Sequence, residues 1–285
     1  MILQLRCFSR CLLIRGIDQH HHAVRDNGAL ILSMTIALLV TTYNSPEYLK
    51  RVLESVAIQT VMPQEVLVAD DGSSSPTADV VLWAKTELRL NVTHCWQRDN
   101  DFRVARSRNL ALSRVQSDYV VMIDGDCILP HTFLEWHQSL AQRGKMVAGN
   151  RRLLLPDRVD ARRNVLTSQD LQGYKFLRLP LGMLRDMQPK NWKSVRTCNL
   201  GCFLHDIRRV EGFDESFIGW GLEDSDLIVR LLRTGVVIRS GRFGVTVGHL
   251  YHKKNIGTMR SPNEQRFKEL FAAGRALPKR SILRR

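Results

Sequence analysis

The sequence lacks three features that mark membrane or secreted proteins. No run of about 18 apolar residues, the length that spans a bilayer, occurs in it, and the longest candidate, 29–40, is interrupted by Ser33 and Thr35. The first 33 residues contain no apolar core followed by a small-residue cleavage site. The six cysteines are scattered and form no Cys-x-x-Cys pair. We therefore expect reduced thiols in a cytoplasmic protein whose membrane contact, if any, is peripheral.

Acidic residues are in short supply. The 285 residues include 28 Asp and Glu against 42 Lys and Arg, which gives a formal net charge of +14. This charge favours an anionic partner, such as a phosphate group, a nucleic acid or an acidic membrane surface. The apolar fraction of 44% is ordinary, so the composition excludes disordered and collagen-like chains. The length suffices for one large domain, or for one domain with an appendage.

The most informative stretch is an apolar run that ends in acids. Four apolar residues follow Tyr119, and Asp124, Gly125 and Asp126 come directly after them. The run predicts a strand covered on both faces, and ligands of such sheets lie beyond the carboxyl ends of the strands. Two carboxylates one residue apart repel each other unless a cation lies beside them, so the spacing points to a divalent metal ion. A simple turn is the alternative, since Asp and Gly are common turn residues.

An alternation of strands and helices begins at Thr35. Ser45 is a good N-cap for a first helix, whose apolar residues recur at helical spacing, and Pro76 suits the first turn of a second helix. The order of the elements predicts a sheet packed between helices. The strands that we expect in this part of the chain are 36–40, 65–69 and 92–96.

Polar residues lie just past the first two strands. Thr42, Tyr43 and Asn44 follow the first strand, and Asp70 and Asp71 open a loop of small residues after the second. Such a loop can approach a ligand closely, although a turn with a helix N-cap explains the two acids equally well. A short helix between 99 and 109 then carries three arginines, which either meet phosphate or form a solvated face. They are Arg103, Arg106 and Arg108.

This ordered set resembles the nucleotide-sugar half of family 2 glycosyltransferases. The resemblance covers about residues 34–150 and rests on T-T-Y-N, A-D-D-G-S-S, R-V-A-R-S-R-N and D-G-D in that order. It implies an α/β GT-A fold, Rossmann-like, with a mixed central sheet. It also implies that either Asp70 or Asp71 contacts the nucleobase, a choice that the spacing leaves open. By position, the residues that would bind the UDP-sugar are Thr42, Tyr43, Asn44, Asp70, Asp71, Arg103, Arg108 and Asp124.

The second half of the chain carries a denser motif. Residues 212–227 read G-F-D-E-S-F-I-G-W-G-L-E-D-S-D-L and run into a helix. Glycines on both sides of Trp220 let the backbone turn around a large aromatic ring, which can face a sugar. The helix dipole stabilises acids at the start of a helix, so Glu223 and Asp224 could be present for stability alone and have no catalytic role. It does not explain Trp220 and its glycines.

This motif resembles the carboxy-terminal part of β-1,4-galactosyltransferases and their bacterial relatives. The resemblance implies that Asp224 is the general base, kept ionised by the helix dipole, and that Glu223 binds the acceptor or donor sugar. The sequence departs from these enzymes at two positions, with Leu222 in place of a third glycine and Ser225 in place of another acid. The sugar preference therefore does not carry across. The implied substrate-binding residues are Trp220, Gly221 and Glu223.

A histidine after a further strand completes the expected site. The V-G-H sequence that ends at His249 resembles the point at which these families supply a histidine to the cation, and His252 is the alternative ligand. A histidine with carboxylate and diphosphate oxygens suits Mn²⁺ best, with Mg²⁺ as the second choice. The expected metal ligands are Asp124, Asp126 and His249.

The chain divides into four expected parts. Residues 1–33 would be an N-terminal extension outside the fold, 34–150 would bind the nucleotide sugar, and 151–260 would bind the acceptor and carry catalysis. Within the third part, residues 151–196 are rich in Arg and Lys. Three roles are open for this stretch: it would cover the donor, bind an acidic acceptor or form a solvated loop. Residues 261–285 form a basic tail, which either lies on an anionic membrane, where each basic residue contributes about 1 kcal/mol, or is a frayed end.

The sequence as a whole predicts an inverting, metal-dependent glycosyltransferase. It would move a hexose or N-acetylhexosamine from a UDP-sugar to a hydroxyl of a growing surface glycan, such as lipopolysaccharide, lipooligosaccharide or capsule. The acceptor would be a glycan or a lipid-linked sugar, and nucleic acid is not expected as a partner. A nucleotidyltransferase could use a similar sheet and metal but has no evident need for the segment 220–226. A non-enzymatic binder of nucleic acid or anionic lipid explains the charge but not the acids at the ends of elements.

Overall fold

A computed structural model describes residues 23–26, 29–32, 34–154, 185–187, 189–242, 244–251 and 262–283. The chain divides into two compact units, residues 1–34 and 35–285. In the first unit, β1 (Ala23–Asp26) and β2 (Ala29–Leu32) form an antiparallel pair. The rest of the expected N-terminal extension lies outside the described residues, as does most of the basic stretch 151–196.

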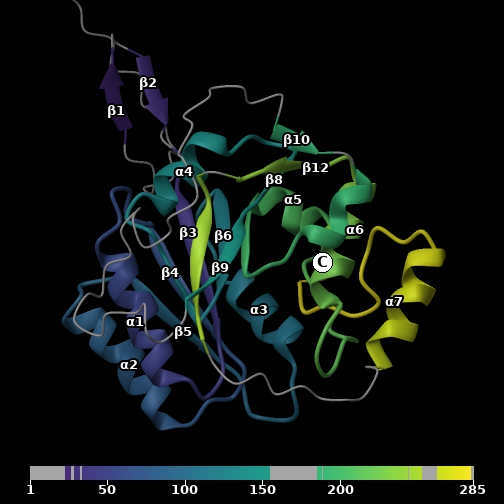
Figure 1. The fold of residues 1–285 in the computed structure, drawn as a ribbon, viewed down its shortest axis with the longest axis horizontal. Helices are drawn as coiled ribbons and strands as arrows, with labels where there is room; N and C mark the ends of the chain where they lie inside the picture. Colours follow the sequence, from purple (N-terminus) through teal and green to yellow (C-terminus); the bar gives the residue numbers. More distant parts are fainter. Residues whose placement is uncertain are drawn as a thin grey trace, which may run out of the picture. The chain divides into compact units, whose positions relative to one another are not determined.

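The second unit is built on a mixed sheet, which in the described residues has eight strands (Figure 1). The strands from β3 to β6 are parallel to one another, so their carboxyl ends meet at one edge. The next strand, β11, is antiparallel to both of its neighbours, which confirms the predicted mixed sheet. Across the sheet the strands are β10 (Asp186–Met187), β12 (Val237–Ser240), β8 (Lys145–Ala148), β11 (Asn199–Phe203), β6 (Tyr119–Asp124), β3 (Ile36–Thr42), β4 (Glu65–Asp70) and β5 (Val92–Trp96).

A smaller three-stranded sheet lies beside the end of β6. It consists of β7 (Cys127–Ile128), β13 (Thr246–Leu250) and β9 (Asn150–Leu154), with β13 in the middle. The antiparallel register pairs His249 with Cys127, the residue after the D-G-D motif. Strand pairing therefore brings the expected histidine ligand next to the expected carboxylate ligands.

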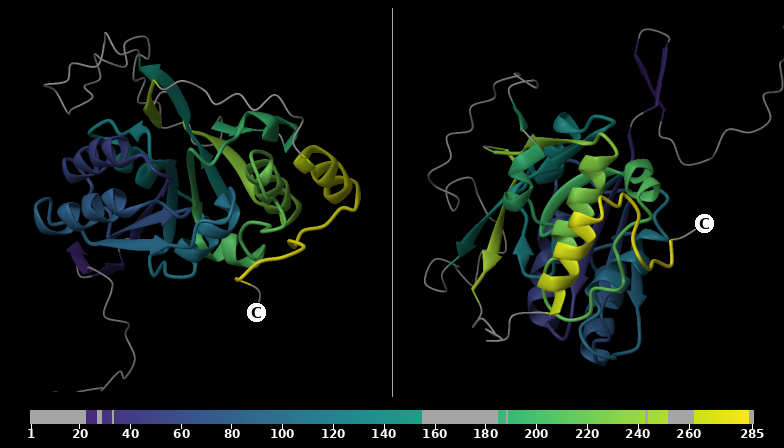
Figure 2. Two further views of the ribbon diagram at one scale, coloured as in Figure 1. Left: turned by 90° about the horizontal axis from the view of Figure 1, so that it is seen from below. Right: turned by 90° about the vertical axis from the view of Figure 1, so that its right-hand side faces the viewer.

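Helices cover both sides of the large sheet. Figure 2 shows α1 and α2 on one side of the strands and α6 and α7 on the other, as Figure 1 does. One buried core cluster joins Leu39 and Leu67 of the sheet with residues of α3, α5 and α6, such as Leu227. The helices are α1 (Pro46–Ala57), α2 (Ser75–Thr86), α3 (Val104–Leu112), α4 (Phe133–Leu140), the 3₁₀ helix η3 (Pro189–Ser194), α5 (Leu204–Arg209), α6 (Glu223–Arg233) and α7 (Pro262–Ala272).

Most predicted element boundaries agree with the structure. The strand predicted at 92–96 is β5, whereas β3 and β4 run one or two residues further than predicted because Thr42 pairs with Asp70. Ser45 occupies the N-cap position of α1, as predicted. Its hydroxyl, however, donates to the carbonyl of Tyr43 instead of capping a helix N–H group.

The basic tail is packed rather than frayed in residues 279–283. The backbone N–H groups of Lys279 and Arg280 donate to the buried carboxylate of Asp214 (2.6 and 3.3 Å), and that of Ile282 donates to Glu215 (2.8 Å). The two acids of the G-F-D-E motif therefore hold the end of the chain. Within the described residues, no helix has both the length and the apolar character needed to cross a bilayer.

Candidate active site

The D-G-D motif lies where β6 ends, at the edge to which the parallel strands point. Asp124 is the last residue of the strand, and the Gly125 N–H donates to the carbonyl of Thr41 on β3 (2.7 Å). A Cβ on Gly125 would lie 2.9 Å from that carbonyl oxygen, so glycine is required for the motif to turn this close to β3. The backbone thus directs two carboxylates into the space beyond the sheet edge.

Two of the three expected metal ligands face each other. The Oδ2 atom of Asp126 lies 3.3 Å from Nε2 of His249. Burial raises the pKa of Asp124 to about 6, against the lowering effect of the Arg108 guanidinium, which lies 3.4 Å from its Oδ1 atom. In the described residues no group of three or more His, Cys, Asp or Glu side chains is arranged to hold a metal ion. His252 lies outside the described residues.

This pair of side chains still fits a cation that shares its ligands with a substrate. One carboxylate and one imidazole suit Mn²⁺, and Mg²⁺ commonly takes only one or two protein carboxylates while phosphate oxygens and water supply the rest. Asp126 and His249 would therefore hold the cation directly, and Asp124 would join it directly or through water.

Arg108 is the centre of the charge network. Its terminal nitrogens lie 2.9 Å from Asp224 Oδ1, 3.2 Å from Glu223 Oε1 and 3.4 Å from Asp124 Oδ1. Its Nε–H donates to the Thr41 hydroxyl (3.1 Å). We had expected Arg108 to meet phosphate or solvent. The structure instead buries its guanidinium among three carboxylates, two of which are more than 100 residues away in sequence.

The two acids at the start of α6 have different protonation behaviour. Burial raises the pKa of Asp224, but Arg108 and hydrogen bonds from Thr197 outweigh burial and hold the pKa below its usual value. The Thr197 hydroxyl (2.6 Å) and N–H (3.2 Å) both donate to Asp224. The expected ionised state is therefore due mainly to Arg108 and Thr197, and not to the helix dipole that the sequence suggests as its cause. Burial and the charge of Asp224 raise the pKa of Glu223 to about 7.

Glu223 also has an oxygen that no described group satisfies. Its Oε1 contacts Arg108, while its Oε2 is buried and has no hydrogen-bond partner in the described residues. A buried polar atom without a partner costs free energy, so such atoms in a native site commonly await a ligand. Neighbouring carboxyls whose pKa values are pushed apart are typical of acid–base sites.

Asp70, the first of the two acids in this loop, forms hydrogen bonds with the loop itself and with β5. Asp70 accepts hydrogen bonds from the N–H groups of Gly72 (3.2 Å) and Ser73 (2.8 Å), and its other oxygen lies 2.7 Å from His94 Nε2. Burial raises the pKa of Asp70, but these bonds lower it further, to below its usual value. Asp70 thus stabilises the loop, as the turn interpretation had predicted.

Asp71 is buried as well. It accepts hydrogen bonds from the Gln97 side chain and from the N–H of Arg103 (2.8 Å). Burial raises its pKa above the usual value despite these bonds. The guanidinium of Arg103 donates to the carbonyl of Arg98, and its Nε has no partner in the described residues. Neither acid is exposed, so the choice between them as the base-binding residue stays open.

Exposed aromatic rings flank this loop. Tyr43 is 44% exposed and its hydroxyl donates to Asp99 (3.2 Å), while Trp96 is 48% exposed and donates to the carbonyl of Ser73 (3.0 Å). Asn44 has a left-handed backbone and its side chain accepts from the Ser74 N–H (2.9 Å). The Thr42 hydroxyl is buried without a partner in the described residues. Sequence reasoning missed Trp96, although a tryptophan as the last residue of the predicted strand 92–96 was an available signal.

The segment before α6 exposes its tryptophan. Trp220 is 81% exposed, so its ring is not part of the core. Gly219 (φ +82°), Gly221 (φ +98°) and Leu222 (φ +72°) all have left-handed backbone. For a leucine this conformation costs about 1–3 kcal/mol and persists only where the surroundings fix it. The third acid in the first turn of α6, Asp226, forms a buried pair with Arg230 (2.8 Å) and is structural.

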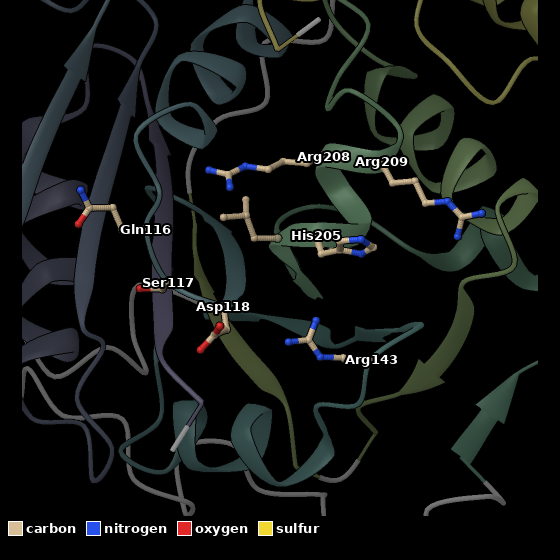
Figure 3. Close-up of a pocket in the computed structure, with 8 residues that line it drawn as sticks. Gln116, Ser117, Asp118, Arg143, His205, Arg208 and Arg209 are labelled. Atoms are coloured by element: carbon tan, nitrogen blue, oxygen red, sulfur yellow. The ribbon is translucent and has the colours of Figure 1, made fainter. Parts of the chain in front are cut away.

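Figure 3 shows a surface pocket that is lined by a different set of residues. It has a volume of about 320 Å³ and is lined by Asp118, Arg143, His205 and Arg208, among others. Asp118 precedes β6 whereas Asp124 ends it, so the length of a six-residue strand, roughly 20 Å, separates the pocket from the D-G-D motif. This pocket is therefore not part of the candidate site.

Comparisons with known proteins identify the family of the chain. The family model described as glycosyl transferase family 2 matches residues 37–198, and the model described as the N-terminal domain of galactosyltransferase matches residues 184–255. Validoxylamine A glucosyltransferase of Streptomyces hygroscopicus subsp. limoneus is 29% identical over 79% of this chain and 54% of that protein. Hyaluronan synthase of Pasteurella multocida is 32% identical over 70% of this chain and 23% of that protein.

A solved structure shares the fold. S. aureus TarS 1-349 in complex with UDP superposes with a TM-score of 0.63 at 18% identity, covering 85% of this chain and 65% of that one. The chain spans little more than half the length of the two validoxylamine A glucosyltransferases that it matches. Since the first family model matches more than half of the 285 residues, the chain belongs to glycosyl transferase family 2.

Proposed function

We propose that this chain transfers a hexose or N-acetylhexosamine from a UDP-sugar to a hydroxyl of a growing glycan, with inversion at the anomeric carbon. One observation carries the proposal. The carboxylates of Asp124, Glu223 and Asp224 converge on the buried guanidinium of Arg108 at the edge where the parallel strands end. Two sequence motifs that lie a hundred residues apart thereby form a single site, and the exposed Trp220 comes three residues before Glu223 in the sequence.

The donor half of this site would be the edge formed by the loops after β3 and β4. Tyr43 and Trp96 offer exposed aromatic faces there, and the buried hydroxyl of Thr42 and Nε of Arg103 have no partners among the described residues. Such atoms suit the hydrogen-bonding groups of a nucleoside. The UDP complex of TarS, named above, supports UDP as the nucleotide.

A divalent cation, Mn²⁺ or Mg²⁺, would be held by Asp126 and His249, with Asp124 direct or through water. When bound, such an ion neutralises the charge that develops on the departing diphosphate. The site is suited to a cation because Asp126 faces His249 and lies two residues from Asp124, whose own cationic partner in the described residues, Arg108, is shared with Asp224. The mannosyltransferase PcManGT, a structural neighbour of this chain (TM-score 0.56), was solved with GDP-Man and Mn²⁺.

Asp224 would act as the general base. The acceptor oxygen attacks the anomeric carbon while the bond from that carbon to the diphosphate oxygen breaks, and the electron pair of that bond leaves with UDP. The acceptor proton passes to Asp224, whose lowered pKa keeps it ionised at neutral pH. Thr197 and Arg108 fix the carboxylate in place. A single displacement of this kind gives a β product from an α donor.

Glu223 and Trp220 would bind the sugars. The unpartnered Oε2 of Glu223 suits a sugar hydroxyl, and the Trp220 ring suits the apolar face of a pyranose. Gly221 gives the loop its left-handed turn. The proposed acceptor is a surface glycan such as lipopolysaccharide, lipooligosaccharide or capsule. The relatives named chondroitin synthase and hyaluronan synthase support a polysaccharide product.

The decisive experiment measures product release from a panel of UDP-sugars with Mn²⁺, with Mg²⁺ and with EDTA. We expect one or more UDP-sugars to release UDP in the presence of the metal and none to do so with EDTA. Release of pyrophosphate from a sugar phosphate and UTP would instead indicate a nucleotidyltransferase. If no UDP-sugar reacts, while the protein binds nucleic acid or anionic vesicles with steep salt dependence, the proposal is wrong.

A further inference from the structure

The loop that carries Trp220 is held from two sides. On one side the Gly219 N–H donates to the carbonyl of Phe102 (2.8 Å). On the other side the side-chain amide of Asn263 donates to the carbonyls of Gly219 (3.4 Å) and Gly221 (3.0 Å). Asn263 belongs to α7 and is 0% exposed. A residue some forty positions further along the chain thus binds the peptide groups on both sides of Trp220.

An asparagine fits this position for a chemical reason. Its NH₂ group has two donors, and each goes to one of the two glycine carbonyls. Its oxygen accepts a hydrogen bond from Arg266 Nη1 (3.0 Å), which orients the amide so that its donors face the loop. No other uncharged side chain of this length offers two donors on one atom and an acceptor beside them.

The same helix is attached to the fold independently of Asn263. The ring of Phe267 packs in a buried cluster with Phe217 and Val229, and its centroid lies 5.4 Å from that of Trp192. Apolar packing therefore docks α7 on the fold. The hydrogen bonds of Asn263 are not needed for this docking and can hold the loop instead. Leu222, whose left-handed backbone needs support, packs on the same cluster.

We propose that Asn263 is a positioning residue for the acceptor half of the site. It fixes the left-handed loop 219–222 so that the exposed ring of Trp220, three residues before Glu223, is held where an acceptor sugar would stack on it. The Phe102 contact ties the same loop to the donor side, because the next residue, Arg103, donates its N–H to Asp71. The inference about acceptor binding rests on the proposed function; the inference about the loop does not.

The loop can be observed directly by ¹⁹F NMR of protein labelled with 5-fluorotryptophan. The sequence has five tryptophans, and Trp220→Phe identifies the Trp220 signal by its loss. In Asn263→Asp, which keeps the shape but removes both donors, we expect the Trp220 signal to shift, broaden or split. The Trp192 signal, which reports on α7 packing, should stay in place. Gln265→Ala, an exposed site on the same helix, is the matched control and should leave all five signals unchanged.

Two NMR outcomes would overturn the proposal. An unchanged Trp220 signal in Asn263→Asp would mean that the amide does not hold the loop. A joint shift of Trp220 and Trp192 would mean that Asn263 only docks α7. If Asn263→Asp does not fold, Asn263→Ser, which retains a single donor, is the milder variant for the same comparison.

Kinetics test the acceptor role, with UDP-glucose and Mn²⁺ as donor system and octyl β-glucoside as acceptor probe. We expect Asn263→Asp to reduce acceptor-dependent UDP release by about 10- to 100-fold, the cost of misplacing a contact by about 1 Å, mainly through the acceptor KM. Hydrolysis without acceptor should change little. Equal loss of both rates would contradict the positioning role. If the wild-type protein releases no UDP from any UDP-sugar, the proposed function fails, yet the NMR result still decides whether Asn263 holds the loop.

Discussion

At the scale of residues, the guanidinium of Arg108 lowers the pKa of each acid that it contacts. A single buried guanidinium contacts Asp124, Glu223 and Asp224, so three groups that would otherwise repel one another can be held close together. Its effect is unequal, because Asp224 also receives two hydrogen bonds from Thr197 while Glu223 keeps an unpartnered oxygen. In the proposed mechanism this inequality makes Asp224 the proton acceptor and leaves Glu223 to bind a sugar.

The first prediction concerns Asp224. Asp224→Asn keeps an oxygen that can accept from Thr197 and Arg108 but removes the basicity, so kcat should fall by roughly 10²–10⁴-fold, the usual share of a general base. Binding of UDP and Mn²⁺ should be nearly unchanged in calorimetry. The anomer of the wild-type product, determined by NMR, tests the mechanism itself. An α-linked product from an α-linked donor would contradict it and would leave Asp224 without the role of base.

A second prediction concerns the cation. Asp126→Ala and His249→Ala should each weaken Mn²⁺-dependent UDP binding by on the order of tenfold or more, because their side chains face each other at 3.3 Å. Titration calorimetry of UDP with and without Mn²⁺ measures this effect. His131→Ala, an exposed histidine before α4, serves as control. If His252→Ala abolishes the metal dependence and His249→Ala does not, the assignment of His249 is wrong.

At the scale of elements, α4 is fastened to the sheet through a neutral histidine. His137 is fully buried, with Tyr119 Oη 3.3 Å from its Nδ1 and Asn199 Oδ1 3.4 Å from its Nε2. Burial lowers its pKa to about 3, with Asn199 acting in the opposite direction. The folded protein therefore binds this proton less readily than the unfolded chain does, and stability depends on pH.

This dependence is the third prediction. The unfolded histidine takes up a proton below about pH 6.5, so the stability due to the neutral form is complete above that pH and is lost as the pH falls toward 3, by about 1.4 kcal/mol at pH 5.5. His137→Gln should reduce this loss, measured as the difference in free energy of urea unfolding between pH 7 and 5.5. His205→Gln, at an exposed position, should not. Equal losses in all three proteins would show that His137 does not titrate as its burial requires.

The docked tail gives a fourth prediction. A chain that ends at Pro278 loses the N–H donors of residues 279–282, which leaves the buried Asp214 and Glu215 short of partners. Each buried group that loses its partner costs about 1–3 kcal/mol, so the melting temperature should fall clearly. Lys279→Ala with Arg280→Ala removes the charges and keeps the backbone bonds, so it should change stability by only about 0.5 kcal/mol. If the double substitution lowers the melting temperature and the truncation does not, the side-chain charges and not the backbone hydrogen bonds hold the tail.

At the scale of the whole molecule, the site exists because two sheets meet. Parallel strands β3, β4 and β6 end at one edge and bring Thr42, Asp70 and Asp124 together. The small sheet adds His249 through the pairing of β13 with β7. Helix α6 then supplies Glu223 and Asp224 on the far side of Arg108. No single segment could form this site alone.

The fifth prediction concerns residues 1–33, which we expect to be an extension outside the fold. Residues 35–285 form a compact unit of their own, so a chain that starts at Met34 should keep its melting temperature and its UDP binding. Differential scanning calorimetry and calorimetric titration of UDP measure these two properties. A large loss of either would show that the segment packs against the core.

The local pattern of the sequence was enough for the parallel strands of the first half and for the place of the D-G-D motif at the end of β6. Apolar runs such as 119–123 define buried strands, because a strand inside a sheet needs apolar side chains on both faces. The acids that follow such runs must lie at the sheet edge, so the D-G-D motif could be placed without a structure. The two glycines that flank Trp220 likewise indicated a tight turn of the backbone around its ring, because a turn depends only on local backbone conformation.

Tertiary structure alone decided which charges meet. Arg108 and Asp224 are 116 residues apart, and nothing local distinguishes this arginine from Arg106, which lies on the same helix and is partly exposed. The same holds for Asp70 and Asp71, whose partners His94 and Gln97 come from a later segment. Local patterns encode backbone conformation and burial, whereas the partner of a buried charge depends on which distant segments the fold brings within about 4 Å.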